Sequence, residues 1–185
     1  MFYHDFGDGN GPVKAKIHFN GGGIVADTAT VDNKAYVSSC SFVYGNATVG
    51  AFTVINLGSR VSGNSIISEY SRINYSRICD QSFIAKNSYV SFSVIIGKYK
   101  TRVGQKISAQ VKGVKSYTIE RSDGHKFNVF REKLTNELII SAGCRYFTFD
   151  QAFQHWYNED YSNQDLAIET MDILQELHNK IKEQS

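Results

Sequence analysis

The sequence has few of the features that mark a disulfide-linked, metal-binding or membrane protein. Its three cysteines, Cys40, Cys79 and Cys144, are odd in number and far apart, which fits neither a disulfide framework nor a metal site. No apolar run is long enough to span a bilayer. The first residues, MFYHDFGDGN, have acids and glycines where a signal peptide needs a basic and then an apolar segment. We therefore expect a cytoplasmic protein without a membrane partner.

Net charge is also small, and proline is almost absent. The 20 Lys and Arg residues and 18 Asp and Glu residues leave a formal net charge of +2, so no large field is available to hold nucleic acid. Pro12 is the single proline, beside fifteen glycines. A chain of 185 residues has room for one sizeable domain, or for one domain with a smaller appendage.

The strongest pattern is an aliphatic residue at every sixth position. These positions are Val25, Val31, Val37, Val43, Val49, Ile55, Val61, Ile67 and Ile73. Four residues after each of them except the last stands a small residue, namely Ala29, Ala35, Ser41, Ala47, Thr53, Ser59, Ser65 and Ser71. One step of five follows, and the six-residue spacing resumes at Ile78, Ile84, Val90 and Ile96. The next aliphatic residue, Val103, comes seven positions later, and there the pattern fades.

A period of six suits neither an α-helix, with a period of 3.6, nor a simple strand, with a period of 2. It indicates short strands joined by corners, with the aliphatic residue pointing inward and the small residue at the corner. Stacked coils of this kind bury a continuous core, and each coil depends on its neighbours. The pattern predicts a parallel β-helix over residues 25–104.

Individual hexads, such as VYGNAT at 43–48 and VSGNSI at 61–66, resemble the hexapeptide-repeat proteins of the LpxA-like superfamily. Residues 20–29 (NGGGIVADTA) are more particularly similar to the opening of uncharacterised hexapeptide proteins of bacteria, prophages and phages. The resemblance implies a left-handed helix, three hexads in each triangular coil, and a homotrimer. A phage-encoded protein of this kind would act in the host cytoplasm.

The flanking segments have a different pattern. Residues 1–24 are expected to form an N-terminal cap, with one strand covering the first coil. Residues 105–185 are expected to form a C-terminal α+β segment, beginning with strands at 114–121 and 126–131 joined by a turn that contains Asp-Gly. Further strands are expected at 137–142 and 144–147.

Two helices are expected to end the chain, near 149–158 and 163–182. Thr148 with Gln151, and Ser162 with Asp165, have the spacing of N-terminal caps. The expected fold is therefore mainly β: a left-handed parallel β-helix with a C-terminal α+β appendage ending in two helices.

Acyl- and acetyltransferases of this superfamily typically use a histidine base in a cleft between subunits. All the histidines of this chain lie outside the repeat, at His4, His18, His125, His155 and His178. We expect His125, at a hairpin tip, and His155, on a helix, to be solvated or packed. No glycine-rich phosphate loop, nucleophile elbow or paired-cysteine metal site is present. These absences favour a non-catalytic protein without a cofactor.

Three hexads per coil place residues 18 apart in one outward column, or 17 apart across the short step. The first face then carries Phe42, Arg60, Arg77 and Ile95, with Tyr44 beside them; the second carries Tyr36, Val54, Arg72 and Tyr89; the third carries Thr30, Thr48, Ile66 and Phe83. The third face has the least charge, so we expect it to form the subunit interface.

Arginines stacked on adjacent strands repel one another and need a reason. Guanidinium groups bind phosphates, and aromatic rings stack on bases. We therefore expect a ligand site formed by Arg60, Arg77, Arg72, Tyr44, Tyr70, Tyr75, Tyr89 and Phe92. The alternative is that the arginines pair with Glu69, Asp80 or a neighbouring subunit, or are solvated.

Three functional hypotheses follow. The first is a homotrimer that binds, and sequesters, a small anionic, nucleotide-like molecule between its subunits; for a phage protein, a counter-defence role is conceivable. The second is an acyl- or acetyltransferase that uses acyl-CoA. The third is a structural module that docks on a protein partner.

Overall fold

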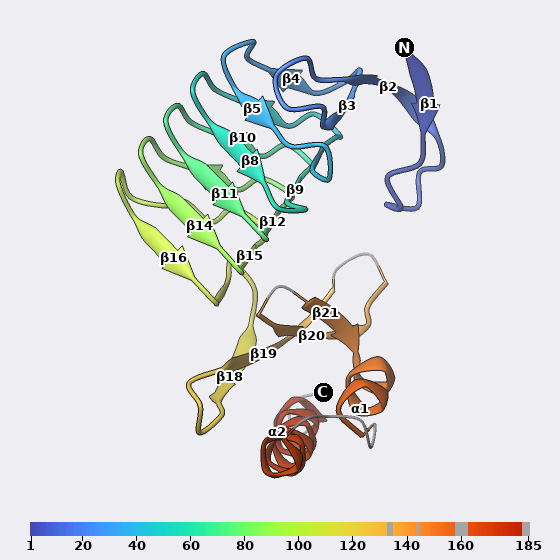
Figure 1. Cartoon of the computed structure of the whole chain (residues 1–185), viewed down its shortest axis with the longest axis vertical. Helices are drawn as coiled ribbons and strands as arrows, with labels where there is room; N and C mark the ends of the chain where they lie inside the picture. Colours follow the sequence, from blue (N-terminus) through green and yellow to red (C-terminus); the bar gives the residue numbers. More distant parts are fainter. Residues whose placement is uncertain (133–134, 144, 158–162, 183–185) are drawn as a thin grey trace. The chain divides into compact units, whose positions relative to one another are not determined.

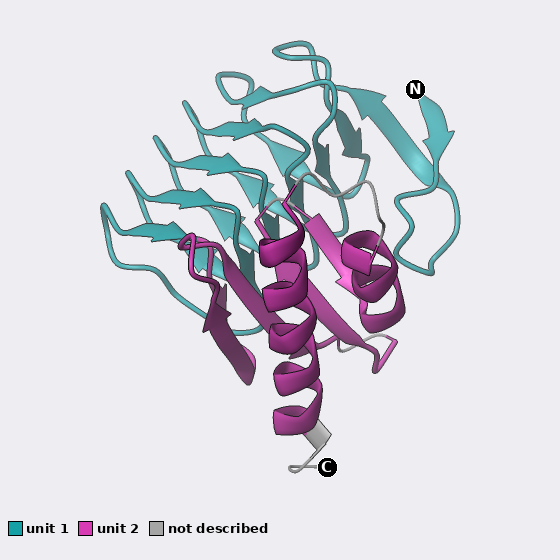
Figure 2. Cartoon of the chain, turned by 60° about the horizontal axis from the view of Figure 1, so that its bottom comes forward, with its two compact units in different colours: residues 1–108 teal, residues 109–185 magenta. Residues whose placement is uncertain are grey.

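A computed structural model describes residues 1–132, 135–143, 145–157 and 163–182. The chain divides into two compact units, Met1–Ser108 and Ala109–Ser185 (Figure 2). Each unit has its own hydrophobic core. Among the described helices, none combines the length and the apolar character needed to cross a membrane.

Unit 1 is a parallel β-solenoid with three faces, and its coils are stacked from the blue to the yellow-green part of the chain in Figure 1. The β9 face contains β3 (Ile24–Ala26), β6 (Phe42–Val43), β9 (Arg60–Val61), β12 (Arg77–Ile78) and β15 (Val94–Ile95). The β10 face contains β4 (Thr30–Val31), β7 (Thr48–Val49), β10 (Ile66–Ile67) and β13 (Phe83–Ile84). The β11 face contains β5 (Tyr36–Val37), β8 (Val54–Asn56), β11 (Arg72–Asn74), β14 (Tyr89–Ser91) and β16 (Lys106–Ser108).

The six-residue period arises because each hexad supplies one short strand and one corner. The aliphatic residue of every hexad points inward, and residues such as Ile55, Ile67 and Ile73 are completely buried. Their counterparts on adjacent coils lie in register, as in the pairing of Ile73 with Ile55 and Val90. The predicted β-solenoid is confirmed.

The register differs from the prediction at the last coils. Ile78 pairs with Ile95 rather than Ile96, so Ile95 points inward and Val94 takes the outward position next to Arg77. A second five-residue step, from Val90 to Ile95, causes the shift. The coils then continue through β16, where Ile107 pairs with Val90.

The N-terminal residues cover the first coil with a hairpin. Strands β1 (Phe2–His4) and β2 (Val13–Ile17) are antiparallel, and β2 pairs with β3. The hairpin is the dark blue segment of Figure 1. One covering strand was expected, and the structure has this strand with a second strand along its outer edge. A paired edge is protected from joining strands of other chains.

Unit 2 is an antiparallel sheet with two helices. After the short strand β17 (Val111–Lys112) come β18 (Ser116–Glu120), β19 (Lys126–Arg131), β20 (Leu138–Ala142) and β21 (Arg145–Thr148), paired in this order. Helices α1 (Phe149–Tyr157) and α2 (Gln164–Lys182) lie side by side on one face of the sheet (Figure 2). Between sheet and helices lies a core that includes Phe127, Ile140, Trp156 and Leu174.

Both helices begin at hydrogen-bonded caps. The backbone amide of Thr148 donates to the Gln151 side chain at 3.0 Å, and the Gln151 amide donates to the Thr148 hydroxyl at 3.2 Å. The predicted capping box is therefore confirmed. Ser162, the expected second cap, lies outside the described residues. In the structure the Asn163 side chain accepts from the amide of Leu166 at 3.2 Å and caps α2.

Candidate functional site

The structure divides the predicted site residues between two faces of the solenoid. Arg72 and Tyr89 are register partners on the β11 face, and the corners at its two edges carry Tyr70 on one side and Tyr75 with Phe92 on the other. Arg60, Arg77 and Tyr44 belong to the β9 face and the corner that follows it. The predicted set is therefore two groups and not one site.

Of the three arginines in the predicted site, Arg72 is the most available to a ligand. Its strand lies between β8 and β14, so Val54 and Tyr89 are its direct neighbours. The Arg72 side chain is exposed. It makes no hydrogen bond or ion pair with any residue that the structure describes. A solvated guanidinium of this kind offers five N–H donors to an incoming anion.

Aromatic pairs border the β11 face at both edges. The rings of Phe52 and Tyr70 stack with centroids 5.0 Å apart and planes 12° apart. At the opposite edge, the rings of Tyr75 and Phe92 stack at 5.1 Å and 10°. Tyr70 remains 56% exposed in spite of its stack, so one surface of the ring is open to solvent.

These four aromatic residues occupy corners where the backbone favours glycine. Their φ angles are +57° at Phe52, +58° at Tyr70, +46° at Tyr75 and +48° at Phe92. A left-handed backbone costs a residue with a side chain about 1–2 kcal/mol. A stacked pair returns about 0.5–1.5 kcal/mol. Because the two strained corners cost more than one stack returns, the rings are not explained by stability alone.

The β9 face holds its arginines in a different way. Arg60 and Arg77 are direct register partners, which confirms the predicted stacking of like charges. Arg60 lies over the Phe42 ring at 5.2 Å and donates to the carbonyl of Phe6 at 3.3 Å. The bond to Phe6 attaches Arg60 to the N-terminal segment. Arg77 is partly buried.

Tyr44 is removed from solvent. It is 4% exposed, and its ring stacks on Phe6 at 4.7 Å. A ring buried in this way cannot receive a base, so Tyr44 belongs to the core. Glu69, one acid considered as an arginine partner, forms its ion pair with Lys86 at 2.7 Å.

A second group of candidate residues lies in unit 2, around a cavity of about 330 Å³. The cavity is lined by Arg121, His125, Ala142, Gly143, Arg145, His155 and Trp156. These residues come from the β18–β19 hairpin, the β20–β21 turn and helix α1. Ligand cavities commonly have volumes upward of about 300 Å³.

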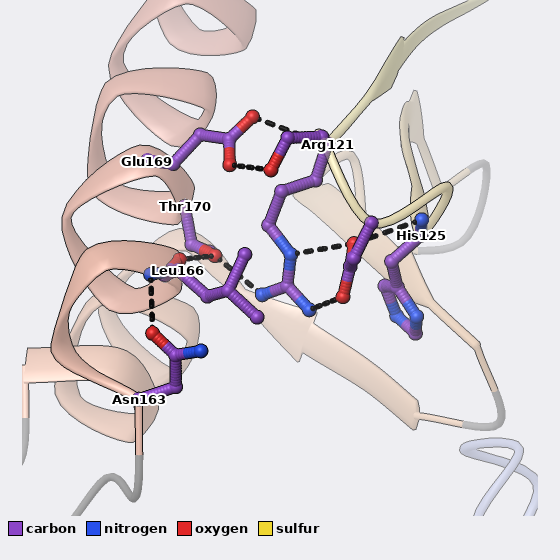
Figure 3. Close-up of polar contacts among 8 residues, drawn as sticks. Arg121, His125, Asn163, Leu166, Glu169 and Thr170 are labelled. Atoms are coloured by element: carbon purple, nitrogen blue, oxygen red, sulfur yellow. Dashed lines mark hydrogen bonds and ion pairs between the residues drawn. The ribbon is translucent and has the colours of Figure 1, made fainter.

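Arg121 anchors the hairpin side of this cavity. Its Nε and Nη2 atoms donate to the two carboxylate oxygens of Asp123 at 3.0 and 2.7 Å, and its Nη1 donates to the Thr170 hydroxyl at 2.8 Å. The Arg121 side chain therefore reaches helix α2, as Figure 3 shows. Glu169 adds a second link by accepting from the amide and the hydroxyl of Ser122. These bonds fix the hairpin carrying His125 against α2.

Arg145 and His155 form the other polar side of the cavity. Nη1 of Arg145 donates to Nε2 of His155 at 2.7 Å. Because a guanidinium can only donate, this imidazole accepts at Nε2 and carries its proton on Nδ1. The imidazole also stacks on Phe147 at 5.1 Å and meets Trp156 edge to face at 4.8 Å. The His155 ring is held on three sides.

Both imidazoles are shifted toward the neutral form. Burial lowers the pKa of His125, the Arg121 guanidinium lowers it further, and the Asp123 carboxylate opposes this in part. Burial, followed by the charge of Arg145, lowers the pKa of His155. The hydrogen bond from Arg121 lowers the pKa of Asp123 to about 2. Near pH 7 the cavity therefore has two guanidinium groups and two neutral imidazoles.

Sequence reasoning did not bring these residues together. His125 and His155 were each expected to be solvated or packed, and the structure places both at one cavity with two arginines. Gly143 was a possible signal. A Cβ at this position would lie 3.1 Å from Cε1 of His125, so the glycine permits the imidazole to approach the β20–β21 turn.

Among the described residues, no group of three or more His, Cys, Asp or Glu side chains is arranged to hold a metal ion. No protein-family model matches the chain, and no curated protein matches it. Among solved structures, the chain is similar to a Bacillus cereus protein described as a putative acetyltransferase, with 11% sequence identity and a TM-score of 0.27. The alignment covers 50% of this chain and 71% of that protein. A likeness this weak carries no information on activity.

Proposed function

We propose that the protein is a non-catalytic hexapeptide-repeat homotrimer that binds a small anionic, nucleotide-like molecule at the β11 face. The observation that carries this proposal is the exposed Arg72 between two pairs of stacked aromatic residues. Arg72 supplies the donors for a phosphate, and the open surface of Tyr70 supplies the platform for a base. The β-solenoid fixes the spacing between them.

The corner that carries Phe52 and Tyr70 joins the β10 face to the β11 face. The β10 face is the one we expect to bind the neighbouring subunit, and Ile66 on it is 44% exposed. A subunit placed there would form one wall of a cleft. Arg72 and Tyr70 would then lie at the rim of that cleft. The left-handed coil and the trimer are parts of this proposal, which follow from the resemblance to hexapeptide proteins.

The binding part is tested with a panel of mono- and dinucleotides, by thermal shift followed by calorimetric titration. We expect at least one nucleotide to raise the Tm, and Arg72→Gln to weaken its binding about 10- to 100-fold. Arg102→Gln is the matched control, because Arg102 is also exposed on the solenoid and lies outside the aromatic pairs. The proposal fails if no nucleotide binds, or if both variants bind alike.

The trimer is tested by native mass spectrometry, which reports the number of chains and any retained ligand together. We expect three chains in the wild type and a single chain in Ile66→Lys, because a buried lysine without a partner is costly at an interface. Ile168→Lys is the control, since Ile168 is an exposed isoleucine of unit 2. A monomeric wild type would remove the cleft. A sequestering role further requires a dissociation half-time of minutes or longer.

A further inference from the structure

The cavity of unit 2 has a charge distribution that the proposed function does not use. Two guanidinium groups and two imidazoles line it, and none of its described lining residues is a carboxylate. Asp123, on the same hairpin as His125, is held by both Nε and Nη2 of Arg121. Positive groups gathered around a cavity favour a negative ligand, because a partly buried site screens their charge less than water does.

We propose that this cavity binds the phosphoryl group of a small molecule, with Arg145 as its charged anchor and His125 and His155 as additional hydrogen-bond donors. This inference rests on unit 2 alone and is independent of the β11 face.

Arg145 is the anchor because it is the exposed guanidinium of the cavity. Arg121 is 6% exposed, and its donors are directed to Asp123 and Thr170. Arg121 therefore positions the hairpin, while its charge adds to the field inside the cavity. A guanidinium carries five N–H donors, and the bond from Arg145 to His155 uses one of them. Arg145 can therefore bind an anion through its remaining donors, and the bond to His155 is lost when that imidazole takes up a proton at Nε2.

The arrangement favours a phosphoryl group over a carboxylate. Arg145 belongs to β21, His155 to α1 and His125 to the β18–β19 turn, so donors approach the cavity from three separate elements. A phosphoryl group has three acceptor oxygens pointing in different directions, and a charge of about −1.5 to −2 near pH 7. A carboxylate has two oxygens in one plane and a single charge. The phosphoryl group matches both the directions and the charge.

Binding should be coupled to proton uptake. The groups that face the two imidazoles are Arg121 and Asp123 on the hairpin and Arg145 on β21; Glu169 of α2 is directed to Ser122. A bound dianion opposes the effect of the guanidinium groups and raises the pKa of both imidazoles. Each imidazole then takes up a proton and becomes a donor at both nitrogens. Affinity should therefore increase as the pH falls toward the range in which histidine titrates, until protonation of the phosphoryl group itself, with a pKa of about 6, reverses the gain.

The test is an NMR titration of the imidazole resonances of the full chain against pH, with and without inorganic phosphate. We expect phosphate to raise the pKa of His125 and His155. Arg145→Gln should weaken phosphate binding about tenfold or more, since it removes the charged donor. Arg131→Gln is the matched control on β19, because Arg131 donates to the carbonyl of Asn136 and is not part of the lining.

Two further ligands test whether the cavity prefers a phosphoryl group to a carboxylate. Glycerol phosphate should raise the same two pKa values, and acetate at equal concentration should not. Equal shifts with acetate would overturn the phosphoryl assignment, and no shift with any anion would overturn the site. Unchanged binding by Arg145→Gln would also overturn the proposal, provided that its Trp156 fluorescence shows a folded unit 2. Arg72→Gln must leave these titrations unaffected, which separates this result from a failure of the nucleotide site.

Discussion

Gly63 lies at a solenoid corner where the next coil leaves no room for a side chain. Its φ is +67°, and an added Cβ would lie 2.7 Å from the backbone nitrogen of Asp80. Gly58 has a similar φ of +75°, but the nearest atom to its added Cβ is the carbonyl oxygen of Cys40 at 4.0 Å. Both glycines therefore need a positive φ, but only at Gly63 would an added Cβ collide with the adjacent coil.

This pair separates backbone strain from steric exclusion. We expect Gly58→Ala to lower the free energy of unfolding by about 1 kcal/mol, because alanine is strained at positive φ. Gly63→Ala should cost about 1–3 kcal/mol more, because the adjacent coil must move to admit the methyl group. Urea unfolding followed by circular dichroism measures both values. Equal losses would show that the coils adjust to the methyl group without cost.

Asp123 links the stability of unit 2 to pH. Its pKa is lowered to about 2 by Arg121, so the folded state favours the charged carboxylate. A depressed pKa stabilises the fold above the unfolded value of about 3.9, and this contribution disappears as the pH falls toward 2. The carboxylate is 36% exposed, so solvent reduces the size of the effect.

We expect wild-type unit 2 to be more stable than the Asp123→Asn variant at pH 7, by a few degrees in Tm. This difference should narrow between about pH 4 and pH 2 as the wild-type carboxylate is protonated. Trp156, the single tryptophan, reports unfolding of unit 2 by fluorescence. A difference that is constant across this range would mean that the ion pair with Arg121 contributes nothing to stability.

At the scale of the element, the small residues that follow each aliphatic position of the repeat determine how adjacent coils are joined. The Ser59 hydroxyl contacts the carbonyls of Asn56 and Ile73 at 2.6 and 3.1 Å, and accepts from the amide of Ser76 at 3.2 Å. The hydroxyl oxygen of Ser65 is buried, and within the described residues it has no hydrogen-bond partner. Ser59 and Ser65 thus occupy equivalent positions in the repeat, but among the described residues only the Ser59 hydroxyl has hydrogen-bond partners.

We expect Ser59→Ala to lower the free energy of unfolding by about 1–3 kcal/mol, because it leaves the buried amide of Ser76 without its acceptor. Ser65→Ala should be neutral or slightly stabilising, because it removes a polar atom that is buried without a partner. Both variants are compared with the wild type by urea unfolding under identical conditions. A substantial loss in Ser65→Ala would indicate a partner such as a buried water.

The repeat pattern predicted the coils because their core position accepts only aliphatic side chains at a fixed spacing. It failed at Ile95 and Ile96, where two neighbouring residues both satisfy that requirement. The length of the preceding corner determines which of these two residues points inward. Asn56 is followed by Leu57 and Gly58 before the next buried serine, whereas Ser91 is followed by Phe92 alone, so that corner is one residue shorter. A serine and an aromatic residue do not reveal this shortening in advance.

The candidate sites were less predictable than the coils because they depend on side-chain contacts. The column containing Arg72 and Tyr89 followed from counting residues, and the structure confirms it. The burial of Tyr44 did not, because it depends on Phe6 from the N-terminal segment. The cavity of unit 2 required the register that places Ala142 opposite Arg145 and Phe127, which no local pattern indicates.

At the scale of the whole molecule, the two units have separate cores. The core of unit 1 is built from stacked aliphatic residues such as Ile55 and Ile73. The core of unit 2 is built around Phe127, Leu174 and Trp156. Among the residues that the structure describes, none belongs to both cores. Units with separate cores can unfold in separate transitions, so a two-state description is not expected to hold.

We expect Trp156 fluorescence and far-ultraviolet circular dichroism to give different urea midpoints. Phe127→Ala should lower the urea midpoint measured by fluorescence. Ile55→Ala should lower the midpoint of the transition that only circular dichroism detects. Each substitution should reduce the free energy of unfolding of its unit by about 2–5 kcal/mol. The proposed trimer forms through the solenoid, so only the unit 1 transition should move to higher urea as protein concentration rises. If both variants shift both probes equally, the units unfold together. If neither transition depends on concentration, no trimer contributes to stability, and the subunit cleft proposed for the nucleotide loses its support.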